Sequence, residues 1–442
     1  MKWFFPVLLF FVFSTPFRAS ADEMIKKDES LNVERCVEIA LKMQPSIVAA
    51  AGTMRATESR IGQAESNYYP QVNWQSSYSR IKPASSSSGN SSGISGGSPG
   101  GSSSSFDQYS AGVNLSQLIY DFGKTPTQVK IQKYNFDSSR SDFASTSEQI
   151  IFNVRQAYYG VLQAKRNKDV STESVRQFQQ HLEQAKGFFE VGTKPKFDVT
   201  KAEVDLGNAK LNLILAENSV RIALVNLNNS MGVPNAPEYT LEDNLTFQKY
   251  SILLGDALSR AFRSRPDLKS AISRRQAAQS AIDLARTGYY PVVTGNAAYN
   301  WSGEKFPLEH GWDIGAAVSF PIFSGFLTKY QVQEAKSNLN VLQANEESVR
   351  QTVISDVQQA FLNLKAAEER VPTAQLNVEQ AQENLDIANG RYAAGVGNPI
   401  EVTDAEVSLI TAKTSYIQAL YDYKVAQASL DKAMGVAAEA RQ

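Results

Sequence analysis

Two features of this sequence could in principle carry covalent or metal chemistry. The letters GNSSG at residues 89–93 match G-x-S-x-G, a turn that presents a nucleophilic serine between a strand and a helix. Here they lie inside a run of serine and glycine, without a strand before them or a helix after them. His181 and His310 are far apart, and neither has further ligands at the spacing of a zinc site. The sequence also lacks a phosphate-binding loop or cofactor fingerprint, so it predicts a protein that is not an enzyme and uses no metal or cofactor.

The carboxylates of Glu401 and Asp404 have a spacing that lets them act together. Residues three apart lie on one face of a helix, so both acids would point the same way. Glu401 also fits a helix N-terminus, with Asn398 as the cap, Pro399 at the first position and the acid at the third. Both interpretations remain open for Glu401, whereas Asp404 is less easily explained as a capping residue.

The stretch that holds these acids occurs twice in the chain. Residues 187–233 recur as residues 390–436, with Gly192 falling on Gly395 and Asp198 on Glu401. In each copy a turn leads into apolar residues spaced alternately three and four apart, the period of a coiled-coil seam. The later seam consists of Leu409, Ala412, Tyr416, Ala419, Tyr423, Ala426, Leu430 and Ala433. Each copy is therefore predicted to be the second arm of a helical hairpin.

The duplication divides the chain into three parts. Residues 1–21 read as a signal peptide, with Lys2, an apolar core and the cleavage site Ala19-Ser20-Ala21. The first structural repeat covers residues 22–233, with a β-hairpin at about 71–120 and a helical hairpin at about 125–231. The second covers residues 234–442, with a β-hairpin at about 292–321 and a helical hairpin at about 328–434. Thr125 is the expected cap of the first long helix, because Pro126 follows it.

Both predicted β-hairpins have the pattern of membrane-spanning strands. Each strand is about ten residues of alternating polar and apolar side chains, and the polar side chains are small and uncharged. A run of serine and glycine, Ser85 to Ser105, separates the first two strands and reads as a flexible loop. Aromatic residues at the strand ends suit the two membrane–water interfaces: Tyr68, Tyr69, Tyr289, Tyr290, Trp301 and Trp312. Taken alone, the strands fit two ordinary hairpins on a soluble core equally well.

Composition narrows the remaining classes of function. The chain has 44 Lys and Arg against 45 Asp and Glu, so charge suggests no affinity for nucleic acid. Cys36 is the single cysteine and cannot form an internal disulfide.

Four strands cannot close a barrel, and an open strand edge in lipid leaves backbone groups unsatisfied. We therefore expect other copies to close it. Eight strands, from two copies, would leave almost no lumen, whereas twelve, from three copies, leave a real one.

Several motifs together resemble the TolC-like outer-membrane factor family over essentially the whole mature chain. They are ALKMQPS at 40–46, YYP at 68–70 and 289–291, YDFG at 120–123 with FSG at 323–325, and RYAAG at 391–395 followed by IEVTDA at 400–405. The resemblance implies a mixed fold, in which each protomer of a homotrimer gives four strands to a transmembrane β-barrel and long helices to a coiled-coil barrel. It further implies the outer membrane of a Gram-negative bacterium, with the helical part in the periplasm.

The same resemblance implies a passive exit duct of a tripartite efflux or type I secretion system. Its partners would be outer-membrane lipid, a periplasmic adaptor (membrane fusion) protein and an inner-membrane pump. Whether the cargo is a drug, a metal or a polypeptide stays open.

The resemblance also implies roles for residues at the ends of the helical hairpins. Glu401 and Asp404 match acids that ring the constriction of the periplasmic mouth, and such a ring would favour cations over anions. Asp198 and Tyr392 match a pair that ties the hairpins together when the mouth is shut. Gly397 stands where some members carry a basic latch residue, so that link is expected to be absent here.

A periplasmic coiled-coil adaptor or scaffold is the main alternative. It would share the signal peptide and the helical hairpins, but it should lack four barrel-type strands with aromatic ends. Recovery from the soluble periplasm rather than the outer membrane would favour it. A secreted hydrolase is a third possibility, which would require that replacing Ser91 abolish a measured activity.

Overall fold

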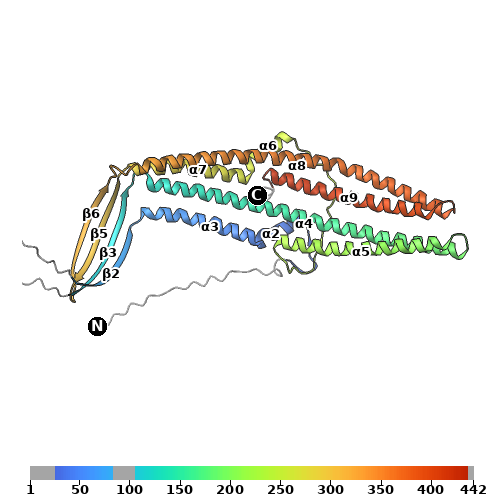
Figure 1. Ribbon diagram of the computed structural model, residues 1–442, viewed down its shortest axis with the longest axis horizontal. Coiled ribbons are helices and arrows are strands. Elements are labelled where there is room, and N and C mark those ends of the chain that lie inside the picture. The colour runs from blue at the N-terminus through green and yellow to red at the C-terminus, as the bar shows by residue number, and fades with distance from the viewer. Residues whose placement is uncertain (1–24, 83–104, 437–442) are drawn as a thin grey trace, which may run out of the picture. The chain divides into compact units, whose positions relative to one another are not determined.

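The computed structural model describes residues 25–82 and 105–436 (Figure 1). The predicted signal peptide and nearly all of the predicted Ser/Gly loop lie outside these residues. The described chain forms two compact units. Unit 1 comprises the residues up to Gly52, Ser141–Lys269, and those from Val349 onward, and unit 2 comprises Thr53–Arg140 and Ser270–Ser348.

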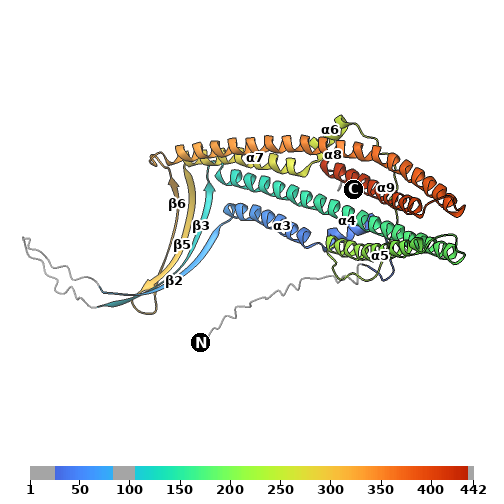
Figure 2. The same ribbon diagram turned by 45° about the vertical axis from the view of Figure 1, so that its right-hand side comes forward.

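Among the described residues of unit 2, four strands form one antiparallel sheet. The strands are β2 (Gln71–Ile81), β3 (Phe106–Tyr120), β5 (Val292–Gly303) and β6 (Glu309–Ser319). Their order is β2-β3-β5-β6, so the two hairpins join through β3 and β5 (Figure 2). Every residue of β2 and of β6 is exposed, which means that the described chain covers neither face of the edge strands. Such strands do not pack as ordinary hairpins on a soluble core.

Unit 2 also holds parts of four helices, namely α3 (Pro45–Glu65), α4 (Lys124–Glu190), α7 (Pro266–Arg286) and α8 (Leu327–Ala393). Ala278, Ile282 and Leu339 form an apolar cluster between α7 and α8, and Arg275 Nε lies 2.6 Å from Glu346 Oε2 beside it. Short 3-10 turns, Ser66–Tyr68 and Thr287–Tyr289, lead from α3 and α7 towards β2 and β5. The two turns occupy equivalent places in the two repeats.

The predicted cap of α4 is wrong. The helix begins at Lys124 rather than after Thr125, and Asp121 receives its first backbone N–H groups. Asp121 Oδ2 accepts from Thr125 N at 2.7 Å, and Oδ1 accepts from Gly123 N at 3.2 Å. A carboxylate binds such N–H groups more strongly than a hydroxyl does, because it carries the charge that the helix N-terminus attracts.

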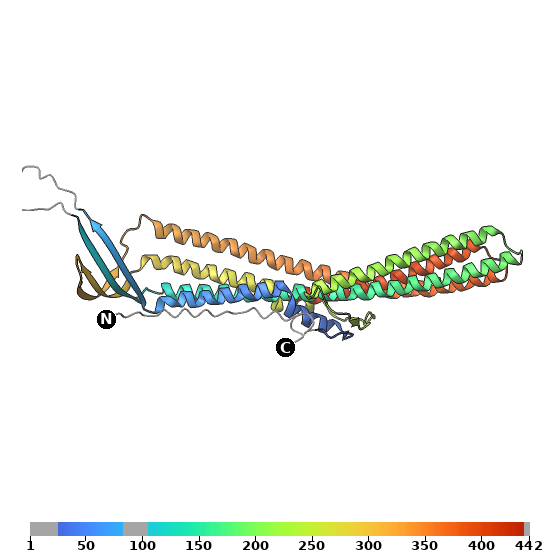
Figure 3. The same ribbon diagram turned by 90° about the horizontal axis from the view of Figure 1, so that it is seen from below.

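Unit 1 is helical apart from a short parallel pair, β1 (Ser30–Leu31) with β4 (Thr240–Leu241). Its further helices are α2 (Val33–Met43), α5 (Lys196–Met231), α6 (Leu254–Ser264) and α9 (Pro399–Ala433). In this unit α4 and α5 form one hairpin and α8 and α9 form another (Figures 1 and 3). The segment before α6 packs on both hairpins, because Tyr158 donates to Glu242 O at 2.7 Å and Tyr423 to Gln248 O at 2.7 Å.

Each hairpin ends in a tight approach that repeats between the two copies. Gly232 follows α5 with φ +75°, and an added Cβ would lie 2.8 Å from the Cα of Gln44. Gly435 follows α9 with φ +71°, and an added Cβ would lie 2.8 Å from the Cα of Arg265. Only glycine fits both the left-handed backbone and the contact.

In the described part of the chain, none of the helices has an apolar stretch of the length and hydropathy needed to cross a membrane.

Candidate functional site

The candidate site lies where the two helical hairpins of unit 1 turn. The α8–α9 turn is closed by hydrogen bonds from Gly395 N to Tyr392 O, 3.0 Å, and from Gly397 N to Arg391 O, 2.9 Å. Gly395 has φ +79°, the left-handed conformation that ends many helices. Asn398 then caps α9 as predicted, with its side chain accepting from Ile400 N at 3.0 Å. The turn therefore fixes the direction in which α9 starts.

Glu401 and Asp404 lie on the first turns of α9, with both side chains exposed to solvent. Glu401 Oε2 is 3.4 Å from Arg391 Nε, and this pair is about half exposed. Within the described residues, Asp404 has no ion pair. Two exposed carboxylates next to a helical turn can attract cations, and their part in a ring stays a prediction.

Tyr392 is fully buried between the hairpins. Its ring centroid is 5.1 Å from His181 and 5.6 Å from Phe188, both on α4. Its hydroxyl has no hydrogen-bond partner among the described residues. Burial raises the pKa of Tyr392, and the charge of nearby Asp198 raises it further. The structure thus places the predicted pair close together without a hydrogen bond between them, and their role in closing the mouth stays a prediction.

Lys194 is a contact that was not predicted from the sequence. It lies in the α4–α5 turn, donates from Nζ to Gly397 O at 3.3 Å, and sits 5.3 Å from the centre of the Tyr392 ring. An added Cβ on Gly397 would lie 2.7 Å from Tyr392 N, so this position has no room for a side chain. A basic group from the first hairpin therefore lies against the backbone at position 397. The signal was available, because aligning the two copies places Lys194 opposite Gly397.

The six predicted girdle residues lie at the two ends of the sheet in unit 2. Tyr68, Tyr69, Tyr289 and Tyr290 precede β2 and β5, and all four are exposed. At the other end Trp312 is exposed, and Trp301 packs beside Tyr299 with 4.6 Å between ring centroids. The two ends are thus both aromatic, as the sequence pattern requires, and contact of these rings with lipid stays a prediction.

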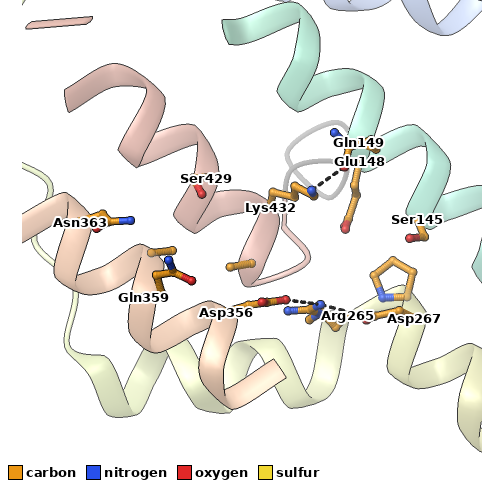
Figure 4. A pocket seen from close by; sticks show the side chains of 13 residues that line it. Ser145, Glu148, Gln149, Arg265, Asp267, Asp356, Gln359, Asn363, Ser429 and Lys432 are labelled. Atoms are coloured by element: carbon orange, nitrogen blue, oxygen red, sulfur yellow. Dashed lines mark hydrogen bonds and ion pairs between the residues drawn. The ribbon is translucent and has the colours of Figure 1, made fainter. Parts of the chain in front are cut away.

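A polar pocket of about 480 Å³ lies elsewhere in unit 1, between α4, α8, α9 and the α6–α7 junction (Figure 4). Arg265 pairs there with Asp267 at 2.7 Å and with Asp356 at 2.8 Å, and Lys432 donates to Gln149 at 2.5 Å. Within the described chain, no three His, Cys, Asp or Glu side chains are grouped to hold a metal ion. We therefore interpret this pocket as a junction between helices that ion pairs hold together.

Most of the chain is similar to known proteins. A family model described as outer membrane efflux protein matches residues 36–233 and 257–436. The outer membrane protein TolC of Vibrio cholerae is 25% identical over 345 residues, which cover 75% of this chain and 78% of that protein.

Solved structures show the same fold. The CmeC outer membrane channel of Campylobacter jejuni matches with a TM-score of 0.78 at 20% identity, covering 92% of this chain and 86% of that one. The outer membrane protein VceC of Vibrio cholerae matches with a TM-score of 0.75 at 18% identity, covering 91% of this chain and 96% of that one. The expected TolC-like combination of strands and long helices is confirmed.

Proposed function

This chain belongs to the outer membrane efflux protein family, and we propose that it forms a trimeric exit duct with an acidic constriction at its periplasmic mouth. At the level of the family, it is a passive outer membrane channel of the TolC type and not an enzyme, with its helical part in the periplasm. Channels of this type work in tripartite efflux pumps with an adaptor protein and an inner-membrane pump. We extend those partners to this chain as part of the proposal.

The observation that carries the trimer is the pair of uncovered edge strands. The outer edges of β2 and β6 have no strand partner among the described residues, and both strands are exposed along their whole length. In lipid each unsatisfied backbone group costs several kcal/mol, so the edges require further strands. Three copies supply twelve strands, enough for a lumen lined by the small polar side chains of the sheet.

A second seam on α5 supports assembly in unit 1. One face of α5 packs inside the chain through Ala202, Leu206 and Ala209. The other face carries five apolar residues separated by seven, four, seven and three positions, which fits a heptad repeat. They are 53% to 65% exposed: Val204, Leu211, Leu215, Ile222 and Val225. An apolar seam of this period needs a partner helix. We assign that helix to a second copy of this chain, since the uncovered strands of unit 2 need further copies as well.

The trimer is tested by placing charge in this seam. Leu211→Glu combined with Leu215→Glu should convert purified trimer to monomer in light scattering, while Asn212→Glu on an exposed position of α5 should leave the trimer intact. A wild-type protein that is monomeric in mild detergent would refute the proposed assembly.

The constriction is proposed from Glu401 and Asp404, which are exposed at the hairpin turn and carry charge that a narrow pore would concentrate. Replacing both by alanine should raise single-channel conductance in planar bilayers and weaken cation selectivity. Glu58→Gln, which removes one exposed carboxylate from α3, serves as the control. Unchanged selectivity in the double variant would remove these two acids from the constriction.

The gate contact is proposed from Asp198 and Tyr392. The buried Tyr392 hydroxyl lacks a hydrogen-bond partner among residues 25–82 and 105–436, and the Asp198 carboxylate is the charge that already acts on it, so a small movement can join them. Tyr392→Phe removes only the hydroxyl and keeps the ring packing. It should increase the fraction of time that the channel is open, and an unchanged open fraction would exclude the contact.

A further inference from the structure

A second pair of acids bridges the two hairpins away from the solvent. Glu406 on α9 is only 3% exposed, and its Oε2 atom has no hydrogen-bond partner among the described residues. Asp205 on α5 is the acid that acts on it electrostatically. Thr403, one turn before Glu406, donates to Asp205 Oδ2 at 3.0 Å, which places α5 and α9 in direct contact here. Two carboxyl groups from different hairpins therefore lie near this contact, close enough for the charge of one to act on the other.

The carboxyl groups of Asp205 and Glu406 have different neighbours. Asp205 is neutralised by Lys201 on its own helix, whose Nζ lies 3.0 Å from Oδ2, and it also receives the Thr403 hydroxyl. In the described part of the chain, Glu406 has neither a cation nor a donor for Oε2. Burial raises the pKa of Glu406 to about 7, and the Asp205 charge raises it in the same direction. A protonated Glu406 can donate a hydrogen bond across the contact, whereas an ionised one places a second negative charge there.

Two further titratable groups pack into the same contact. From α4, His181 is buried, and its Nδ1 has no hydrogen-bond partner in the part of the chain that the structure describes. Burial lowers the pKa of His181, although Asp205 and Asp198 act in the opposite direction. From α8, Tyr392 contributes a hydroxyl that stays protonated because its pKa is raised. Between pH 5 and 8, therefore, Glu406 and His181 are the groups in this contact whose charge can change.

We propose that the Glu406 carboxyl, buried against Asp205 where α5 meets α9, is a proton-operated joint that holds the two helical hairpins together when protonated and loosens them when ionised. This inference deepens the proposed function, on which it rests for its role in regulating the mouth of the duct. The joint depends only on the packing of the helices, so its opening can be measured without a transport assay.

The pH dependence of the hairpin packing has a definite direction, because the pKa of Glu406 is raised in the packed state. An acid whose pKa is higher in the packed state stabilises packing at low pH, and that stabilisation is lost as the pH rises from its ordinary pKa of 4.5 to about 7. Above pH 7 the loss is complete and shifts the equilibrium towards separated hairpins by up to about 300-fold. At low pH, protonation of His181 would destabilise the packing, because burial lowers the pKa of this side chain.

The experiment measures the distance between the two turns in the full-length protein. Spin labels on Thr193→Cys and Val396→Cys, in a chain with Cys36→Ala, are followed by pulsed electron resonance from pH 5 to pH 8.5. Labelled chains are diluted with unlabelled ones so that only distances within one chain are seen. We expect a short distance at low pH and a growing population of longer distances as the pH rises.

Glu406→Gln should keep the short distance at every pH. Asp205→Asn should move the change to lower pH, because it removes the negative charge that raises the pKa of Glu406. Glu203→Gln, an exposed acid on α5, should behave as wild type, and His181→Phe should leave the change above pH 6 intact. A pH-independent distance in the wild type, or a Glu406→Gln protein that separates as the wild type does, would overturn the joint. Loss of conductance with an intact distance change would instead count against the proposed duct.

Discussion

Replacing Gly397 with alanine tests whether space, rather than backbone conformation, requires glycine at the α8–α9 turn. The added Cβ would lie 2.7 Å from Tyr392 N, 2.9 Å from Arg391 C and 3.0 Å from Tyr392 Cα. These are backbone atoms and cannot rotate away, so the turn must shift. Overpacking of this kind costs about 1–3 kcal/mol. The shift would also disturb the hydrogen bond from Lys194 Nζ to Gly397 O.

Gly395 and Gly207 provide matched comparisons. Gly395 has φ +79° with open space around its Cβ direction, so alanine there carries only the left-handed backbone cost of about 1–2 kcal/mol. Gly207 is inside α5 with open space, and alanine there should stabilise the helix by about 1 kcal/mol. The three substitutions add the same methyl group to a crowded site, to an open site with a left-handed backbone, and to an open site inside a helix.

Limited proteolysis at the turn is the assay, because cleavage under native conditions follows the population of the locally opened state. A cost of about 1–3 kcal/mol corresponds to roughly 5-fold to 150-fold faster cleavage for Gly397→Ala. Gly397→Arg, which adds a much larger side chain at the same position, should be cleaved at least as fast. If Gly397→Ala is cleaved at the wild-type rate, the turn has room for a side chain and the reasoning fails.

Three further changes test single contacts in unit 1. Lys194→Met removes the ammonium group beside the Tyr392 ring, a contact of about 0.5–1 kcal/mol, so proteolysis at the turns should rise a few-fold, and an unchanged rate would exclude the contact. Arg265→Met leaves Asp356 unpaired. Because the Asp356 side chain is 44% exposed, we expect the free energy of unfolding, measured with guanidinium, to fall by about 1–2 kcal/mol, which is less than the cost of breaking a buried pair. An unchanged free energy of unfolding would contradict the pairing. Burial raises the pKa of the Cys36 thiol to about 12, so at pH 8 a maleimide should label it only after unfolding, and rapid labelling of the native protein would contradict its burial.

The order of residues was enough to predict the repeated architecture. Period two marks the strands, spacing of three and four marks the helical seams, and these periods survive in any fold because they follow from the geometry of single elements. The cap at Asn398 was predicted for the same local reason, and the structure confirms it. The cap at Thr125 was predicted wrongly because Asp121, three residues before the helix, was a stronger acceptor than the residue next to the proline.

What the sequence by itself determined is therefore the kind of element at each place, the duplication and the family. Only the tertiary structure decided which side chains meet across the hairpins. Lys194 with Gly397 and Asp205 with Glu406 are each about two hundred residues apart. Their contact depends on how two coiled seams are set against one another, and no local period encodes that. The raised pKa of Glu406 follows from that packing, because it depends on burial and on Asp205 from a different helix. The absence of room at Gly397 is local by contrast, because it depends on the backbone of Arg391 and Tyr392 at the adjoining end of α8.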